Sequence, residues 1–170
     1  MNLPEKFEVL VITLSDRAFS GTYNDLSGPR IRKKLEEYFV DENIDSNINL
    51  TLIPDDAGML KELIEKASGS CNFIFTTGGT GIGPRDITIE TVVPLMEKQI
   101  PGVMEFIRVK YGTANPAALL SRGVAGVIGK ALVYTLPGSL KAVDEYMTEI
   151  VRTLRHTLQM QYGIDIHPKH

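Results

Sequence analysis

The segment Cys71–Asp86, CNFIFTTGGTGIGPRD, joins an apolar run to a glycine-rich loop that ends on a charged pair. Its first part, Cys71–Phe75, has the aromatic and β-branched content of a buried strand, and Thr76 and Thr77 begin the exit from it. The glycines that follow lack the side chains that would hold a ligand away from the backbone N–H groups. The segment therefore predicts a strand that leads into an anion-binding loop.

The loop matches neither of two common phosphate-binding motifs. Gly78–Gly83 has the glycine spacing of a P-loop, but Pro84 and Arg85 stand where Lys and Ser or Thr are required. A dinucleotide fingerprint starting at Gly79 also fails, because its third glycine position holds Pro84. Alone, such a loop can be a plain tight turn. Arg85 and Asp86 favour a ligand site, because they add a cation for phosphate and a carboxylate for a metal.

The composition limits the classes of protein that the chain can represent. Its 170 residues, 43% hydrophobic and 23% charged, suffice for one core, so we expect a single domain over residues 1–170 with a flexible tail at 164–170. The net charge of −3 argues against a nucleic acid partner. Without a long apolar stretch or a signal-like start, we expect no membrane association and a cytoplasmic location. The single cysteine, Cys71, is expected to be an inert core thiol.

Strand and helix patterns alternate along the chain. Nearly continuous apolar runs predict buried strands at Glu8–Leu14, Ile48–Ile53, Cys71–Phe75 and Lys130–Leu136. Apolar residues at helical spacing predict helices over Pro29–Phe39, Met59–Ala67, Val103–Tyr111 and Leu140–Leu158. This alternation predicts an α/β fold: a three-layer sandwich with a mostly parallel sheet flanked by helices.

Other segments give weaker patterns. We expect loops at Ala18–Leu26 and Asp41–Asn47, and a short helix with a turn within Pro116–Gly129. Several residues predict helix ends: Gly69 and Gly163 as C-terminal ends, Thr88 as an N-cap, Pro94 as a kink or the start of a new turn, and Pro101 with Gly102 as a break.

Polar clusters come directly after four of the predicted strands. They are Ser15-Asp16-Arg17, Asp55-Asp56, Thr76–Asp86 and Pro137-Gly138-Ser139. Because parallel α/β sheets bind ligands beyond the carboxyl ends of their strands, the clusters are expected at one edge. Each also has a purely structural interpretation, since Asp16 and Asp56 can cap helices and Pro137 with Gly138 can form a turn. Because all four clusters are expected at the same edge of the sheet, together they favour a ligand-binding site there.

Several carboxylates beside a glycine loop predict a divalent metal. Like charges ~4 Å apart repel by about 4 kcal/mol at an effective dielectric near ~20, so Asp55 and Asp86 would repel a polyphosphate. Mg²⁺ takes one or two carboxylates together with phosphate oxygens. Asp55 and Asp86 are therefore the candidate metal ligands. Ser15, Thr80 and Ser121 are candidate donors to phosphate or to a polar ring.

Five short motifs extend over nearly the whole chain. They are Leu14-Ser15-Asp16-Arg17, Ile53-Pro54-Asp55-Asp56, Thr77-Gly78-Gly79-Thr80-Gly81 with Arg85-Asp86 and Thr88, Leu120-Ser121-Arg122, and Leu136-Pro137-Gly138-Ser139. In this order and spacing the chain resembles the molybdenum cofactor biosynthesis family, and within it the molybdopterin adenylyltransferase branch.

The resemblance implies a fold of the molybdenum cofactor biosynthesis type and a homotrimer, in which the apolar segment Val124–Ile128 can be interface or core. It implies a reaction of molybdopterin with Mg-ATP that gives adenylylated molybdopterin and pyrophosphate. Asp55 and Asp86 are implied to serve adenylyl transfer. A molybdenum insertase is one partner that the resemblance suggests.

The resemblance also implies substrate-binding residues. Those matching the pterin and nucleotide site are Ser15, Gly79, Thr80, Ser121, Pro137 and Gly138. From their place in the same motifs we add Asp16, Gly78, Gly81, Arg85 and Ser139.

Two alternatives remain open. The first is a relative that binds the pterin but has lost adenylylation, against which the intact glycine run at residues 78–81 and the Arg85-Asp86 pair argue. The second is a scaffold, without enzymatic activity, that docks cofactor-assembly partners. Pyrophosphate release on mixing the protein with molybdopterin and ATP would separate them.

Overall fold

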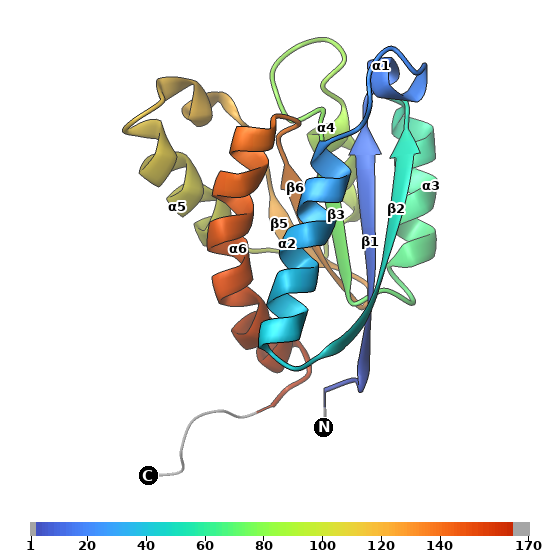
Figure 1. Ribbon diagram of the computed structural model, residues 1–170, viewed down its shortest axis with the longest axis vertical. Coiled ribbons are helices and arrows are strands. Elements are labelled where there is room, and N and C mark those ends of the chain that lie inside the picture. Colours follow the sequence, from blue (N-terminus) through green and yellow to red (C-terminus); the bar gives the residue numbers. More distant parts are fainter. Residues whose placement is uncertain (1–2, 165–170) are drawn as a thin grey trace.

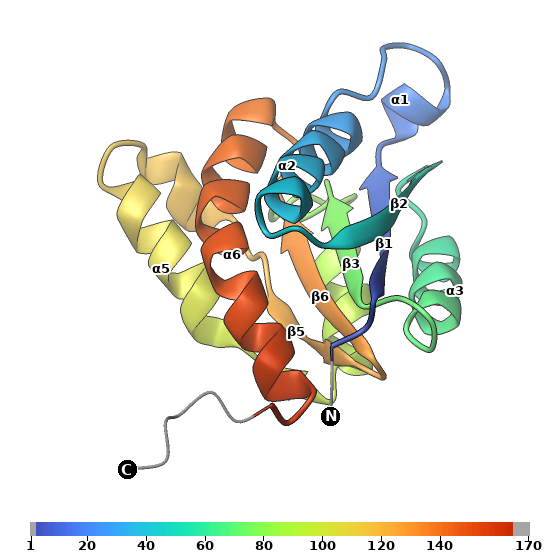
Figure 2. The same ribbon diagram turned by 60° about the horizontal axis from the view of Figure 1, so that its bottom comes forward.

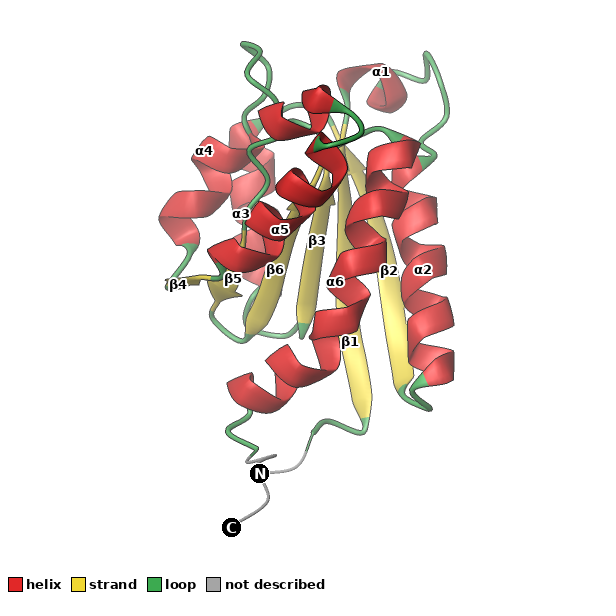
Figure 3. Cartoon of the chain, turned by 90° about the vertical axis from the view of Figure 1, so that its left-hand side faces the viewer, coloured by secondary structure: helices red, strands yellow, loops and turns green. Residues whose placement is uncertain are grey.

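The computed structural model describes residues 3–164, so the expected tail lies outside the described residues apart from Ile164. A six-stranded sheet with the order β2-β1-β3-β6-β5-β4 lies between two layers of helices (Figure 1, Figure 3). The neighbours among β2, β1, β3 and β6 are parallel, and β5 and β4 continue the sheet in antiparallel pairs. The predicted three-layer α/β fold with a mostly parallel sheet is confirmed.

The four parallel strands end together at one edge of the sheet. They are β1 (Lys6–Leu14), β2 (Asp45–Ile53), β3 (Phe73–Thr77) and β6 (Ala131–Leu136). The register pairs Leu14 with Ile53 and Thr77 with both Thr13 and Leu136. Every residue of β3 is buried, because the strand lies between β1 and β6 and is covered on both faces. The segments that follow these strands therefore emerge side by side.

The antiparallel edge was not foreseen. β5 (Ala125–Ile128) and β6 form a hairpin across Gly129, whose φ of +55° suits a tight turn, and β4 (Lys98–Gln99) pairs with β5. Ala125 and Ile128 are buried in the two core clusters. Of the two interpretations of Val124–Ile128, the structure therefore supports the core one.

Helices cover both faces of the sheet (Figure 2). On one face lie α2 (Ser27–Asp41), α5 (Pro101–Gly112) and α6 (Leu140–Gln161), and on the other α3 (Ala57–Ala67) and α4 (Thr88–Val92). The predicted apolar stripe of α6 is buried from Val143 to Leu158, but Leu140 is partly exposed because it starts the helix at the rim. None of the helices within residues 3–164 is long and apolar enough to cross a membrane.

Several expected boundaries were wrong. The segment Ala18–Leu26 is not all loop, because α1 (Asp16–Phe19) forms a helical turn. The connection expected at Asp41–Asn47 is shorter, since α2 runs to Asp41 and β2 begins at Asp45. Pro101 opens α5 instead of preceding it, which suits a residue that lacks an N–H.

The expected helix ends had mixed outcomes. Thr88 is the buried first residue of α4 instead of its N-cap. The end of α3 is capped at Ser68, so Gly69 is not the cap, whereas Gly163 follows α6 with a φ of +63°. Pro94 starts a new turn, the 3-10 helix η1 (Val93–Leu95), and a second one, η2 (Pro116–Leu120), follows α5.

Candidate functional site

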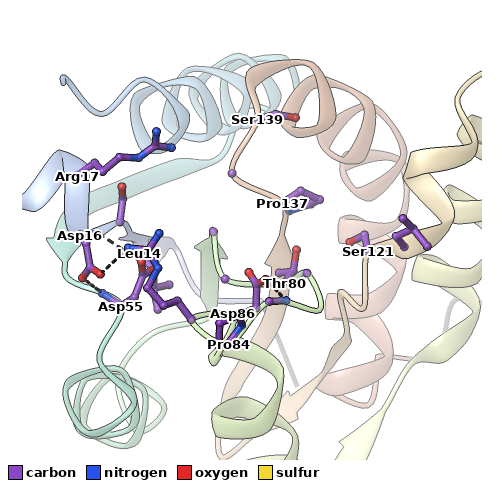
Figure 4. Close-up of a pocket in the computed structure, with 18 of the residues that line it drawn as sticks. Leu14, Asp16, Arg17, Asp55, Thr80, Pro84, Asp86, Ser121, Pro137 and Ser139 are labelled. Atoms are coloured by element: carbon purple, nitrogen blue, oxygen red, sulfur yellow. Dashed lines mark hydrogen bonds and ion pairs between the residues drawn. The ribbon is translucent and has the colours of Figure 1, made fainter. Parts of the chain in front are cut away.

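A cavity of about 720 Å³ lies at the edge where the parallel strands end (Figure 4). Its volume falls in the range of about 300–1,000 Å³ that is typical of small-molecule sites. All residues predicted from the sequence to form the site line it: Ser15, Asp16, Asp55, Gly78, Gly79, Thr80, Gly81, Arg85, Asp86, Ser121, Pro137, Gly138 and Ser139. The structure thus brings the predicted set together, and the role of each residue stays a prediction.

Asp16 and Asp55 hold the ends of β1 and β2 together. The backbone N–H of Asp55 donates to Oδ1 of Asp16 at 2.9 Å, and the backbone N–H of Asp16 points to Oδ2 of Asp55 at 3.4 Å. Arg85 lies 3.5 Å from Asp16, but its side chain is 72% exposed, so this ion pair contributes little to stability. Asp16 does not cap a helix; it fixes the backbone of Asp55 instead.

The carboxyl group of Asp55 lies in an unfavourable electrostatic environment. Burial raises its pKa above the ordinary value, and the nearby charges of Asp16 and Asp86 raise it further. The hydrogen bond from the backbone of Asp16 and the charge of Arg85 lower the pKa but do not offset the rise. Asp55 thus has two carboxylates near it and one exposed arginine that partly offsets their charge.

The glycine loop leaves β3 through a very narrow passage. Gly78 donates its N–H to the carbonyl of Leu136 at 3.0 Å and has a φ of +103°. A β-carbon on Gly78 would overlap the carbonyl oxygen of Leu14, and one on Gly79 would lie 2.5 Å from Oγ1 of Thr88. Side chains are therefore excluded at both positions, independently of any ligand.

Thr88 holds the start of the glycine loop in place through two hydrogen bonds. Its hydroxyl donates to the carbonyl of Gly78 at 2.8 Å, and its N–H donates to the carbonyl of Gly79 at 3.1 Å. The side chain is fully buried. Thr88 of the sequence motif thus holds the glycine loop by these two hydrogen bonds and does not act as the predicted N-cap of α4.

Asp86 closes the outer part of the glycine loop. Its Oδ2 accepts the N–H of Gly83 at 2.7 Å, and a β-carbon on Gly81 would lie 2.7 Å from the same oxygen. This leaves Oδ1 without a hydrogen bond among the described residues. Asp86 therefore orders the loop with one oxygen and presents the other as a potential ligand.

Arg122 holds the glycine loop through two further hydrogen bonds. Its Nε donates to the carbonyl of Gly81 at 2.7 Å, and its backbone N–H donates to the carbonyl of Thr80 at 3.0 Å. The guanidinium also pairs with Glu90 on α4, and the hydrogen bond from Arg122 lowers the pKa of Glu90. Arg122 belongs to the Leu120-Ser121-Arg122 motif, but the sequence alone did not predict this role for it.

The serines of the site serve as caps as well as lining residues. Ser15 accepts the N–H of Ala18 at the start of α1, and Ser139 accepts the N–H of Ala142 at the start of α6. The 22-residue helix α6 therefore directs its positive N-terminal end toward the cavity. Ser121 accepts a hydrogen bond of 2.9 Å from Tyr146, which fixes its hydroxyl oxygen at the cavity wall.

Two other sequence-level interpretations have clear outcomes. Asp56 caps α3 by accepting the N–H of Met59 at 2.8 Å and does not line the cavity, so its structural interpretation is correct. Cys71 is half-buried just before β3, and burial raises the pKa of its thiol, as befits an unreactive group.

Seven residues that line the cavity were not among the predicted site residues. They are Leu14, Arg17, Tyr23, Gly83, Pro84, Ala117 and Leu120. All except Tyr23 and Ala117 lie inside the clusters or motifs quoted from the sequence, so they required only that the whole segment be assigned to the site. Tyr23 lies in the segment expected to be plain loop, where the turn residues Gly21 and Asn24-Asp25 near it were the available signal.

The donor set fits a hard cation such as Mg²⁺. Within residues 3–164, no group of three or more histidine, cysteine, aspartate or glutamate side chains is placed to hold a metal by itself. Asp55 and Asp86 offer two carboxylates, and the charge of Asp86 contributes to the raised pKa of Asp55. Mg²⁺ is commonly held by one or two carboxylates and completed by waters and substrate phosphates, so a pair suffices.

The sheet order and the cavity define an α/β protein with a ligand site beyond the carboxyl ends of its parallel strands. Residues 10–156 match the family model described as a probable molybdopterin binding domain. The chain belongs to this family, as its motifs predicted.

Two relatives and one solved structure illustrate the similarity. Proteins named molybdopterin adenylyltransferase from Helicobacter pylori and Pyrococcus furiosus are 32% and 34% identical to the chain; the matches cover 90% and 92% of it and 86% and 92% of those proteins. The crystal structure of the molybdopterin biosynthesis enzyme MoaB from Thermus thermophilus aligns with a TM-score of 0.81 at 34% identity, covering 92% of this chain and 97% of that one.

The domain also occurs within longer proteins. The molybdenum cofactor synthesis protein cinnamon of Drosophila melanogaster is 34% identical over 152 residues, and the match spans 25% of that protein. The chain therefore corresponds to about a quarter of the Drosophila protein and to most of the bacterial and archaeal relatives.

The two arginines of the site should differ in their effect on stability. Arg122→Ala removes the clamp on the glycine loop and should lower the midpoint of thermal unfolding by about 3–6 °C. Arg85→Ala removes one exposed ion pair and should change it by less than about 1 °C. Calorimetry of both variants checks this, and equal midpoints would show that Arg122 does not hold the loop.

The stability of Asp55→Asn should depend on pH. Because the pKa of Asp55 is raised in the folded protein, ionisation of this group destabilises the fold. The destabilisation is absent below the ordinary carboxyl pKa of about 4 and develops as the pH rises through the raised pKa of the folded protein. Replacing the charge by an amide should therefore raise the unfolding midpoint by about 1–3 °C at pH 7. The gain should shrink as the pH falls toward about 4.

Asp56→Asn is the matched control for this measurement. Asparagine caps helices about as well as aspartate, so the variant should unfold near the wild-type midpoint at both pH values. A loss of stability in Asp55→Asn that is the same at both pH values would contradict the electrostatic argument.

Proposed function

We propose that the chain is a nucleotidyltransferase of molybdenum cofactor biosynthesis that adenylylates molybdopterin with Mg-ATP and releases pyrophosphate. The observation that carries the proposal is the meeting of Asp55, Asp86, Arg85 and the glycine loop in one cavity. The names of the two relatives described above support it. The cytoplasmic location and a molybdenum insertase partner stay predictions.

The reaction joins two anionic molecules. The terminal phosphate of molybdopterin attacks the α-phosphorus of ATP, a new phosphoanhydride bond forms, and the bond to pyrophosphate breaks. A phosphate with a second pKa of about 6 is already mostly a dianion at neutral pH, so it needs little help from a general base. The protein must instead hold both anions in line and offset their charge.

The residues of the cavity suit these two tasks. Asp55 and Asp86 would hold Mg²⁺, which supplies positive charge for the phosphates as they react. Arg85 is exposed at the cavity rim and is free to reach a phosphate oxygen, since its link to Asp16 is long. The end of α6 and the backbone of the glycine loop add fixed partial positive charge.

Asp55 also has the electrostatic signature of a functional residue. A carboxylate that is desolvated and faces two others destabilises the folded chain. Such an arrangement is typical of sites where a cation or substrate supplies the missing charge. The raised pKa of Asp55 supports the proposed metal site independently of the family relationship.

Replacement of either aspartate should abolish most of the activity while the fold survives. Asp55→Asn and Asp86→Asn each keep the shape of the side chain, and turnover should fall by about 10²- to 10³-fold. The double variant should be little worse than the worse single one, because groups that serve one metal act as a unit. Pyrophosphate release with molybdopterin and Mg-ATP measures all three.

Near-wild-type turnover in either single variant would contradict the shared metal site. Losses that simply multiply in the double variant would contradict it as well, because they would indicate two independent roles. Absence of pyrophosphate release in the wild-type protein, with molybdopterin still bound, would favour the alternative of a pterin-binding relative without adenylylation.

The chain should assemble as a cyclic homotrimer. The support within the structure is a group of exposed apolar side chains on α5 and η2: Phe106, Val109, Leu119 and Leu120, each more than half exposed. Light scattering at micromolar concentration should give three times the chain mass, and Val109→Asp should shift it toward the monomer. A monomer mass for the wild type would contradict the prediction.

A further inference from the structure

Tyr23 lies where two cavities of the protein meet. It lines the main cavity, and it also lines a smaller one of about 150 Å³ beside it. Ser15, Leu14 and Gly138 line both cavities as well, so the two lie side by side. The side chain of Tyr23 is 43% exposed, which leaves a large part of its ring available to a ligand.

The ring of Tyr23 is held in a defined position. Its hydroxyl lies 2.8 Å from Oγ of Ser15, and the guanidinium of Arg17 lies over the ring, 5.1 Å from its centroid. Both partners themselves line the main cavity: Ser15 directly follows β1, and Arg17 lies in α1. A ring fixed at its edge and on one face loses little conformational entropy when it contacts a ligand.

Asp25 fixes the backbone that carries Tyr23. Its Oδ1 accepts the N–H groups of Ser27 and Gly28 at 3.0 and 3.1 Å and the hydroxyl of Ser27 at 3.1 Å. Its Oδ2 accepts the hydroxyl of Thr13 at 2.7 Å. The carboxylate therefore ties the loop to both β1 and the start of α2, where Leu26 provides no side-chain cap.

The fit around Asp25 is close. A β-carbon on Gly28 would lie 2.6 Å from Oδ2 of Asp25 and 2.5 Å from Oγ1 of Thr13. A side chain at position 28 would thus displace Asp25 or Thr13 and disturb these hydrogen bonds. Tyr23 lies two residues before Asp25, in the segment that these hydrogen bonds anchor.

We propose that Tyr23 is a substrate-contact residue that stacks on a planar heteroaromatic ring, and that Asp25 is its positioning residue. The inference rests on the proposed function, whose two substrates each contain such a ring: the adenine of ATP and the pterin of molybdopterin. Stacking of a nucleobase on an aromatic side chain raises affinity on the order of ten- to hundredfold. The site thereby gains an apolar contact beside its charged groups.

Binding measurements with three variants test the contact of Tyr23. Tyr23→Ala removes the ring and should weaken the binding of one substrate by about tenfold, equivalent to about 1.4 kcal/mol. Tyr23→Phe keeps the ring, and its affinity should stay within about threefold of wild type. Phe19→Ala is the matched control, because Phe19 is an exposed aromatic residue on α1 that lines neither cavity.

Calorimetric titrations with Mg-ATP and with molybdopterin, done separately, identify the ring. Weaker binding of Mg-ATP alone assigns Tyr23 to adenine, and weaker binding of molybdopterin alone assigns it to the pterin. Unchanged affinity of Tyr23→Ala for both substrates overturns the inference and leaves the proposed function standing. Wild-type protein that binds neither substrate overturns both.

A tryptophan reporter gives a second readout. The chain contains no tryptophan, so Tyr23→Trp introduces a single one at the proposed contact. Its fluorescence should change on addition of the substrate whose binding Tyr23→Ala weakens, and not on addition of the other. A signal that responds to neither substrate contradicts stacking at this position.

The positioning role of Asp25 is tested by a pair of variants. Asp25→Ala removes all four hydrogen bonds and should weaken the same substrate as Tyr23→Ala does. Asp25→Asn keeps an acceptor for the backbone N–H groups, and the hydroxyl of Thr13 can turn to accept from its amide, so affinity should recover to within about threefold. Equal weakening of both substrates in Asp25→Ala would show general loss of structure and overturn the positioning role.

Discussion

The passage of Gly78 between the ends of β1 and β6 is the constraint on which the site depends. The glycine donates to the carbonyl of Leu136 and leaves no room for a β-carbon beside the carbonyl of Leu14. Backbone from three neighbouring strands is thus in contact at one point. The loop after Gly78, the turn after Leu14 and the Pro137-Gly138 segment can share a cavity because their strands end in register at this contact.

The charges of the site work against the stability of the fold. Asp55 is partly buried, lies near Asp16 and Asp86, and has a raised pKa, while Arg85 is exposed and makes only a long ion pair of 3.5 Å with Asp16. Burial of a charge without a full partner is unfavourable, and proteins keep such groups mainly where a ligand supplies the missing charge. Elsewhere the chain compensates its buried charge: Glu149, almost fully buried on α6, accepts hydrogen bonds from Lys110 and Tyr111. The contrast sets Asp55 apart from the structural carboxylates.

The sequence predicted those features that depend on local pattern or on the direction of parallel strands. Apolar runs identified β1, β2, β3 and β6, and the rule for parallel sheets then placed the predicted site residues at one edge, where the cavity is found. The short edge strand β4 has only two residues and no pattern of its own, so it was missed. The roles of Arg122 and Thr88 were missed because their partners, Gly81 and Gly78, are brought to them only by the folded loop.

Most polar residues of the cavity have already committed part of their hydrogen-bonding capacity to the fold. Ser15 and Ser139 cap helices, and one oxygen of Asp86 closes the glycine loop. An alanine at any of these positions would disturb the backbone and the ligand contact together, so a loss of activity there would not identify a contact. The ring of Tyr23 is different. Its position is set by Ser15, by Arg17 and by the segment anchored at Asp25. The hydrogen bonds that anchor this segment are accepted by Asp25 and do not involve the ring of Tyr23. The aromatic face of Tyr23 is therefore a part of the site in which ligand recognition can be separated from the stability of the fold.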